Sequence, residues 1–396
     1  MTGHAHAAPG DDFTGRDTAR VLRIVTIACA VVIVIGAIVL WPSGDRTTDP
    51  LGLQADPQDA HVTAVEELPC TSDPNAQCAV VTFEVRSGAH AGEVASIEQS
   101  VDTSISAGDD IEITVTELED GTTLYSFYDF ERSTPLIVLV VLFVGAVVAL
   151  GRWRGVGALA GLVVSLAIIV WFALPSLVDG NNAVSVALVT AGAVAIVALY
   201  LAHGVGPATD VALLSTFASL ALTGLLAWIF VEVGNFTGLT DDASFVLQSL
   251  ETGIDPRGIL LAGIVIGSLG VLDDVTVTQV SAVWELHRSR PDVGRRTLFT
   301  SALKIGRDHI SSTVNTLFLA YAGAALPLLL LFTGVGESIT GVATREIVAT
   351  EIVRALVGSI GLVASVPIST WLAAQVVTSR PSRDVGGPTR RRHASE

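Results

Sequence analysis

Long apolar stretches, separated by short polar segments, dominate the chain from residue 21 to residue 376. Each runs for 16 to 27 residues, and about 20 apolar residues in a helix cross the ~30 Å hydrocarbon core of a bilayer. The pattern predicts eight transmembrane helices, at residues 21–41, 135–150, 155–178, 183–202, 208–233, 258–283, 309–333 and 350–376. Residues 241–254 are a further candidate, for a helix in the membrane interface.

The segment 42–133 follows a different pattern. Apolar residues occupy every second position in the stretches 80–86 and 111–115, as in half-buried strands. Ser87-Gly88 and residues 107–110 have the composition of the turns between such strands. We therefore expect a small β domain here, an OB-like barrel or a sandwich.

Composition agrees with a membrane protein. Of 396 residues, 50% are hydrophobic and only 15% are charged, with a mean hydropathy of +0.61, whereas a soluble domain carries about 25% charge. These values exclude a soluble enzyme, a nucleic-acid-binding protein and a disordered chain. The net charge is −17, of which −16 lies within 42–133. That acidic surface is either a solvated face or a cation-attracting vestibule.

Basic residues predict the orientation, because they concentrate on the cytoplasmic side of membrane proteins. With the N-terminus inside, 16 of the 22 Lys and Arg are cytoplasmic. We expect a multi-pass protein of the bacterial cell membrane with both termini cytoplasmic. Its parts are a disordered tail (1–20), the first helix (21–41), the extracytoplasmic β domain (42–133), a bundle of about seven spans (134–376) and a basic tail (377–396). The fold class is an all-α transmembrane bundle with a small β domain.

Cys70 and Cys78 lie close together in the outer segment. A disulfide is the leading interpretation, because oxidising compartments preserve disulfides and small domains gain stability from them. Two free thiols and a metal site are the alternatives, and no His or third Cys nearby completes a metal site.

The window from Gly258 to Glu285 has polar residues at membrane depth. At helical spacing, one face collects Gly263, Gly267, Gly270, Asp274, Thr278, Ser281 and Glu285. The glycines suit close helix packing. A carboxylate near the bilayer centre costs about 2.5–3.5 kcal/mol, so such a residue is a candidate for proton or ion coupling. Asp274 lies on the polar face with Thr278 one turn away, and its neighbour Asp273 points about 100° away from it. A purely structural role, tying helices together, is the alternative.

The next helix supplies candidate partners. Asp308, Ser311 and Asn315 share one helical face. Asp308 is also placed to stabilise a helix N-terminus, and Asn315 to hydrogen-bond to another helix. The sequence has no phosphate-binding loop, nucleophile elbow, zinc-protease helix or Cys-x-x-Cys pair. We therefore expect no enzyme activity, no cofactor and no resident metal.

Two stretches carry a resemblance to a known family. Residues 267–275, Gly-Ser-Leu-Gly-Val-Leu-Asp-Asp-Val, resemble the first signature of the bacterial YibE/F-like family. Residues 305–310, Ile-Gly-Arg-Asp-His-Ile, and the residues after them up to Tyr321 resemble its second signature. The Asp of the motif matches Asp274, whereas Asp273 replaces a usual apolar residue. The resemblance implies a membrane topology of one helix, a β-rich outer domain and a helical bundle.

A more distant likeness extends from Asp274 to Thr316. This stretch consists of a helix with acidic residues, an Arg-rich loop and a helix that starts with Arg307. It is similar to the core of SecF-type and other RND-superfamily proteins. That likeness implies an intramembrane Asp linked to proton flow. The chain departs from it by about two extra spans and by having one outer domain.

Two functions follow as hypotheses. The first is an ion- or proton-coupled secondary transporter that uses Asp274, with Asp273, Thr278, Asn315 and Asp308 around it, for an unknown solute or ion. The second is a non-catalytic scaffold, assembly or regulatory protein whose outer domain binds an envelope protein. Both place the chain in a lipid bilayer, and neither involves nucleic acid.

Overall fold

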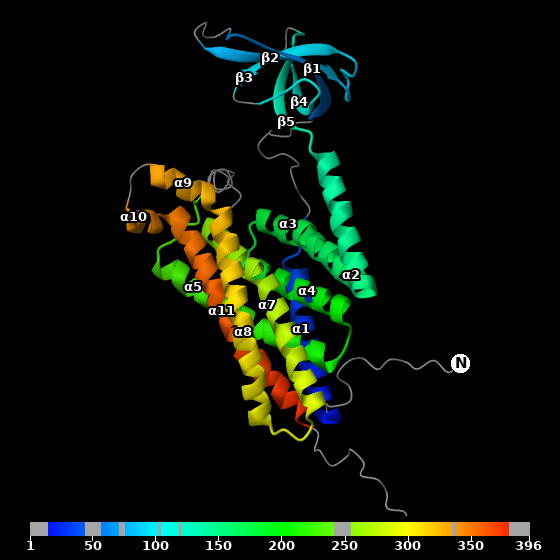
Figure 1. Ribbon diagram of the computed structural model, residues 1–396, viewed down its shortest axis with the longest axis vertical. Helices are drawn as coiled ribbons and strands as arrows, with labels where there is room; N and C mark the ends of the chain where they lie inside the picture. Colours follow the sequence, from blue (N-terminus) through cyan, green and yellow to red (C-terminus); the bar gives the residue numbers. More distant parts are fainter. Residues whose placement is uncertain are drawn as a thin grey trace, which may run out of the picture. The chain divides into compact units, whose positions relative to one another are not determined.

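The computed structural model describes residues 15–43, 57–70, 76–101, 104–118, 121–240, 255–334 and 338–379 (Figure 1). The chain forms two compact units, one of residues 47–149 and one that combines residues 1–46 with 150–396. The interfacial helix expected at 241–254 and most of both expected tails, 1–14 and 380–396, lie outside the described residues. The fold class, a helical bundle with a small β domain, is confirmed.

The first unit contains a five-stranded antiparallel sheet (Figure 1). Its strands are β1 (Gln58–Pro69), β2 (Gln77–Val85), β3 (Val94–Ser100), β4 (Asp110–Glu117) and β5 (Thr123–Phe130). They are ordered β3-β2-β1-β4-β5, and the outermost strands β3 and β5 also contact each other. The sheet is thus a nearly closed barrel, the OB-like alternative of the prediction.

Alternation along the strands builds the core of this barrel. Val81, Phe83 and Val85 of β2 are at most 1% exposed, while the residues between them are more accessible. Ile111 and Ile113 of β4 face the same core. Gly88 turns the chain after β2 with φ +79°, a backbone conformation that favours glycine. The period-two pattern in the sequence therefore predicted both strands, and the composition of Ser87-Gly88 predicted the turn.

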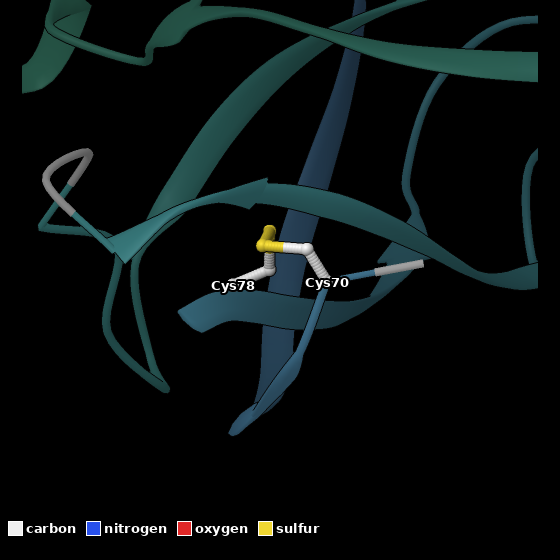
Figure 2. The surroundings of a disulfide bond; sticks show 2 residues. All are labelled: Cys70 and Cys78. Carbon is white, nitrogen blue, oxygen red and sulfur yellow. A yellow bond between two sulfur atoms is a disulfide. The ribbon is translucent and has the colours of Figure 1, made fainter. Parts of the chain in front are cut away.

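Cys70 follows β1 and Cys78 lies in β2, and a disulfide joins them (Figure 2). Their Cα atoms are 4.9 Å apart. Glu98 of β3 lies close to both sulfur atoms, a grouping with the composition of a small metal site. Because both sulfurs are consumed by the disulfide, neither is available as a thiolate ligand.

A polar cluster joins the ends of three strands across the barrel seam. The Tyr125 hydroxyl donates to Glu93 Oε2 at 2.6 Å, and His90 Nδ1 lies 3.2 Å from Glu93 Oε1. His90 Nε2 lies 3.5 Å from Glu117 Oε1. The hydrogen bond from Tyr125, and then that from His90, lowers the pKa of Glu93. The same bond to Glu93 raises the pKa of Tyr125 to about 12.

The second unit is helical, and α2 enters it from the first unit. The helices are α1 (Arg16–Val39), α2 (Ser133–Ile168), η2 (Ile169–Ala173), α3 (Leu174–Val178), α4 (Ala183–His203), α5 (Pro207–Val233), α7 (Pro256–Ser289), α8 (Arg295–Ala324), α9 (Leu326–Gly334), α10 (Ile339–Ala343) and α11 (Glu346–Val377). The π-helical turn η2 joins α2 to α3 without a loop.

Among the described residues, six helices are long and apolar enough to span a membrane, or seven if the bent pair α8 and α9 is one span. The sequence predicted eight. The number is lower because the predicted spans 135–150 and 155–178 belong to one continuous helical segment, Ser133–Val178. Within it Arg152 has the non-helical dihedrals φ 50° and ψ −133°, so two helices meet there without a connecting loop.

Close contacts among α5, α7 and α11 form the centre of the bundle, with α4 against α7 and α8 against α11 (Figure 1). The interior combines aliphatic side chains with buried hydroxyls, including Thr216, Ser365 and Ser369. Gly361 of α11 faces the Thr223 side chain of α5 so closely that a Cβ atom would overlap it. Small residues therefore allow these helices to approach each other, as is typical of membrane bundles.

The Tyr125–Glu93 bond predicts a pH dependence of the barrel. A carboxyl whose pKa is lowered on folding stabilises the fold above its ordinary value of 4.5, and this contribution disappears as the pH falls through the lowered value. We expect hydrogen-exchange protection of β3 and β5, measured in the intact protein, to fall below that pH. Tyr125→Phe should lower protection at neutral pH and flatten the acid response. Tyr128→Phe, on the same strand, is the control, and equal profiles for both variants would contradict this role.

The α5–α11 contact predicts a large effect of a single methyl group. Gly361→Ala should lower the thermal unfolding midpoint in detergent, because overpacking of this kind costs about 1–3 kcal/mol. Gly270→Ala is the matched control, since no atom lies within 4 Å of the position of its added Cβ. A midpoint for Gly361→Ala as high as that of the control would show that the two helices separate easily.

Candidate functional site

The helix α7 begins at a defined cap and presents the predicted face. Asp255 Oδ1 accepts a hydrogen bond from the Arg257 backbone N–H at 3.1 Å, and Pro256 starts the first turn. The face predicted from the sequence consists of exposed residues throughout: Gly263, Gly267, Gly270, Asp274, Thr278, Ser281 and Glu285. The opposite side of α7 packs on α5 and α11.

The adjacent residues Asp273 and Asp274 have different surroundings. Asp274 is exposed, and Asp273 is half-buried. The Asp273 Oδ1 atom is buried and has no hydrogen-bond partner among the described residues. Thr216 of α5 lies beside the Asp273 side chain. Asp273 is therefore the carboxyl group that faces the inside of the bundle, about midway along α7.

Hydroxyl groups order the backbone around these carboxyls. Thr276 Oγ1 donates to the Asp273 carbonyl at 3.0 Å and also lies 2.8 Å from Thr216 Oγ1. Thr278 Oγ1 donates to the Asp274 carbonyl at 2.7 Å. The Thr216–Thr276 pair is fully buried, so it fixes α5 against α7 next to Asp273.

A cavity of about 300 Å³ lies beside both carboxyls. It is lined by Ala158 of α2, by Ala198, Leu199, Ala202 and His203 of α4, and by Asp273, Asp274, Val277 and Thr278 of α7. A water molecule takes ~30 Å³ of liquid volume, so a polar cavity of this size has room for several.

A second cavity of about 310 Å³ adjoins the first. The two share Ala202, His203 and Val277, and the second adds Arg154, Thr209 and Ser281. We call these two adjoining cavities the path: Asp273 lines the first, Arg154 lines the second, and His203 lines both. A carboxyl and an imidazole are groups that can take up and release a proton.

The base of this path is held by further polar contacts. The Tyr200 hydroxyl donates to Asp210 Oδ1 at 2.6 Å, and Asp210 is only 3% exposed. Thr209 Oγ1 donates to the Gly204 carbonyl at 2.8 Å. These bonds close the turn between α4 and α5, which positions His203 at the cavity.

A glutamine ties α7 to two other helices below the carboxyls. Gln279 Nε2 donates to the Ala302 carbonyl of α8 at 2.9 Å and to Thr370 Oγ1 of α11 at 2.7 Å. Gly306 of α8 leaves room for this side chain, because a Cβ atom there would overlap Val366 and approach Gln279. The three helices are therefore fixed in register next to the site.

The structure brings together only some of the predicted site residues. Asp273, Asp274 and Thr278 line one cavity. Asp308 and Asn315 lie on an exposed face of α8 and line neither cavity. The sequence reasoning missed His203, Arg154 and Thr216. His203 and Arg154 lie at the ends of apolar runs, and a titratable residue at such a boundary is the signal that could have found them.

The structure and the comparisons with known proteins identify the class of protein. Its apolar helices require a lipid bilayer, so it is an integral membrane protein. The family model described as YibE/F-like protein matches residues 139–379, and the chain belongs to that family. The matched region includes the α7 carboxyls and leaves the barrel outside. No curated protein and no solved structure matches the chain significantly.

The cavity predicts a difference in accessibility along α4. In a Cys29→Ser background, Ala202→Cys should react with a water-soluble maleimide, because Ala202 borders both polar cavities. Ala195→Cys on the same helix should not react, since Ala195 is fully buried. Failure of Ala202→Cys to react, measured by mass spectrometry in intact membranes, would show that the path is dry. Reaction of Ala195→Cys to the same extent would show that the labelling does not report on the cavity.

Proposed function

We propose that this protein is an ion- or proton-coupled secondary transporter in which Asp273 binds the coupling ion. The observation that carries the proposal is the buried, unpaired Oδ1 atom of Asp273 beside a cavity that Asp274, Thr278 and His203 also line, about midway along α7. An isolated carboxylate in hydrocarbon is costly. A carboxyl kept at such a position is therefore best explained by a ligand that binds it and leaves again.

The surroundings of Asp273 support a proton or a small cation as that ligand. The Thr216 and Thr276 hydroxyls are oxygen donors next to the carboxyl. His203 and Arg154 line the second cavity, where a neutral imidazole can accept a proton. Asp274 at the cavity wall is the second acidic group. No resident metal or organic cofactor is part of this proposal.

The proposed orientation follows the distribution of basic residues. Arg152, Arg154 and the α7–α8 connection would face the cytoplasm of a bacterial cell, as would both termini. The path from Asp273 to Arg154 would then open to the cytoplasm. The acidic barrel would lie outside the cell membrane, where its disulfide is stable.

A scaffold function is the second candidate. The barrel carries most of the negative charge of the chain and lies outside the family match, which favours a recognition role for an envelope protein. In that case the barrel, and not α7, would be the essential part.

Ion flux separates the two candidates. Purified protein in liposomes should carry a proton or cation current under an imposed gradient. Asp273→Asn should reduce it to the level of protein-free liposomes, because the amide does not take up a proton or bind a cation electrostatically. Asp274→Asn should have a smaller effect. Asp292→Asn, in the exposed α7–α8 connection, is the control.

Two outcomes would contradict the transporter proposal. A current that persists in Asp273→Asn would exclude Asp273 as the ion-binding residue. No current in any folded, inserted variant, together with loss of cellular function on deletion of residues 57–130, would favour the scaffold.

A further inference from the structure

A largely apolar cavity lies where α9 and α10 meet the ends of α8 and α11 (Figure 1). Its volume is about 440 Å³. Phe318 and Tyr321 of α8, Phe332 of α9 and Ile352 of α11 line it, and so does Ala325 at the 60° bend between α8 and α9. We call it the α8–α11 cavity. It shares no lining residue with the two cavities of the path.

The α8–α11 cavity opens at the surface of membrane-spanning helices. Phe318 and Ile352, which line it from two helices, are 55% and 39% exposed. Both helices belong to segments that are long and apolar enough to cross a membrane. Apolar walls do not hold water, which needs polar partners, and an unfilled cavity loses the dispersion contacts of its lining. A bilayer therefore fills this cavity with hydrocarbon.

Length and volume favour one acyl chain over a helix as the occupant. On α11 the lining extends from Val348 to Ala355, which is about 10 Å at the rise of an α-helix. A partner helix of that length, with side chains about 10–12 Å across, would occupy roughly 800 Å³ or more. That exceeds the volume of the cavity, whereas a single hydrocarbon chain is much thinner than a helix.

The interior of the cavity carries no net charge. Glu351 is the only charged residue among those that line it. The Glu351 Oε1 atom lies 2.7 Å from Arg354 Nη1, so an ion pair neutralises this carboxylate. An ionic group of a ligand would therefore find no unbalanced opposite charge inside the cavity.

A positive group lies at the end of the cavity nearest the membrane surface. Arg345 is the N-cap of α11 and is exposed. Its Cζ atom lies 5.0 Å from the centroid of the Phe332 ring, which lines the cavity. The neighbouring Glu346 carboxylate is bonded elsewhere, because it accepts from the backbone N–H groups of Thr237 and Gly238 at 2.6 and 2.8 Å. The arrangement is a cation at the end of a membrane span, next to a neutral, apolar interior.

We propose that the α8–α11 cavity is a binding site for a phospholipid, with the phosphate group at Arg345 and one acyl chain in the cavity. A guanidinium forms charge-assisted hydrogen bonds with phosphate, and the apolar side chains pack against the hydrocarbon. The direction also fits, because the chain extends from the end of α11 toward the middle of the membrane, as the lipids of that leaflet do. In the orientation proposed above, this is the outer leaflet. The site does not depend on ion transport.

A bulky side chain in the cavity tests the position of the acyl chain. Ala322 lines the cavity, whereas Ala324 on the same helix is exposed and does not line it. Dioleoyl phosphatidylglycerol is titrated onto delipidated protein in detergent, and bound lipid is counted by native mass spectrometry. Ala322→Trp should weaken binding about tenfold or more, because the indole ring takes the space of the chain. Ala324→Trp should bind as the wild type does, and equal affinities of the two variants would overturn the proposal.

A charge substitution tests the position of the phosphate group. Arg345→Gln should weaken binding of the same lipid about fivefold, as expected for one basic residue at a membrane surface. Arg290→Gln, exposed at the opposite end of the helical unit, is the control. Equal affinities of these two variants would overturn the proposal, because the occupant would then be an apolar molecule without a phosphate. Displacement of the lipid by inorganic phosphate would overturn it as well, because the chain would then contribute nothing.

Photolabelling of the unaltered protein locates the chain without any variant. The probe is a phosphatidylglycerol with a diazirine in its acyl chain, mixed into liposomes that contain the protein. After irradiation, adducts mapped by mass spectrometry should concentrate at Phe318 and Ile352. Leu166 of α2 and Leu225 of α5, which are 59% and 51% exposed and lie outside the cavity, should be labelled less. Labelling in proportion to exposed area, with no excess at the cavity, would overturn the proposal whatever the outcome of the ion-flux experiment.

Discussion

The helical unit depends on one constraint: a polar group in hydrocarbon needs a partner within the protein. Hydroxyls at the α5–α7–α11 contact satisfy this constraint by donating to a carbonyl one turn earlier on their own helix, as Ser215, Thr223 and Thr370 do. Such bonds hold each hydroxyl against its own helix. Neighbouring helices can then approach closely, as Gly361 does to Thr223. Gln279 instead bonds to two other helices, which fixes α7 in depth and rotation.

Several buried polar atoms of the described residues lack a hydrogen-bond partner, Ser219 Oγ and Thr190 Oγ1 among them, and Asp273 is the acidic side chain of this group. Thr216 pairs with Thr276 and also hydrogen-bonds to the Asp273 side chain, and Thr276 bonds to the Asp273 carbonyl. The Oδ1 atom is left without a partner among the described residues, next to a cavity and not in a packed core. A residue that served only to tie helices together would lie where Gln279 lies, with its polar atoms bonded. Its position therefore favours an ion-binding role over the purely structural one.

Local patterns predicted much of this protein, and distant contacts could not be predicted. The α7 face was found because spacings of three and four residues define one side of a helix. The strands around Phe83 and Ile111 were found from their period of two. The cavity beside Asp273 depends on α2, α4 and α7 meeting at Ala158, His203 and Asp273, which no local pattern records. The sequence placed a break between residues 150 and 155, but it did not show that the two helices join there without a loop, because a basic residue between apolar runs is equally typical of a loop.

Two adjacent carboxyls on one helix necessarily face different neighbours, since successive residues differ by about 100°. On α7 this places the Asp273 side chain beside Thr216 of α5, and Asp274 on the exposed face at the cavity wall. The two carboxyls therefore differ in solvation although they are neighbours in the sequence. Because Gln279 holds α7 against α8 and α11, this difference is built into the packing of the helix, and in the proposed transporter it makes Asp273 the carboxyl whose charge depends on a bound ion.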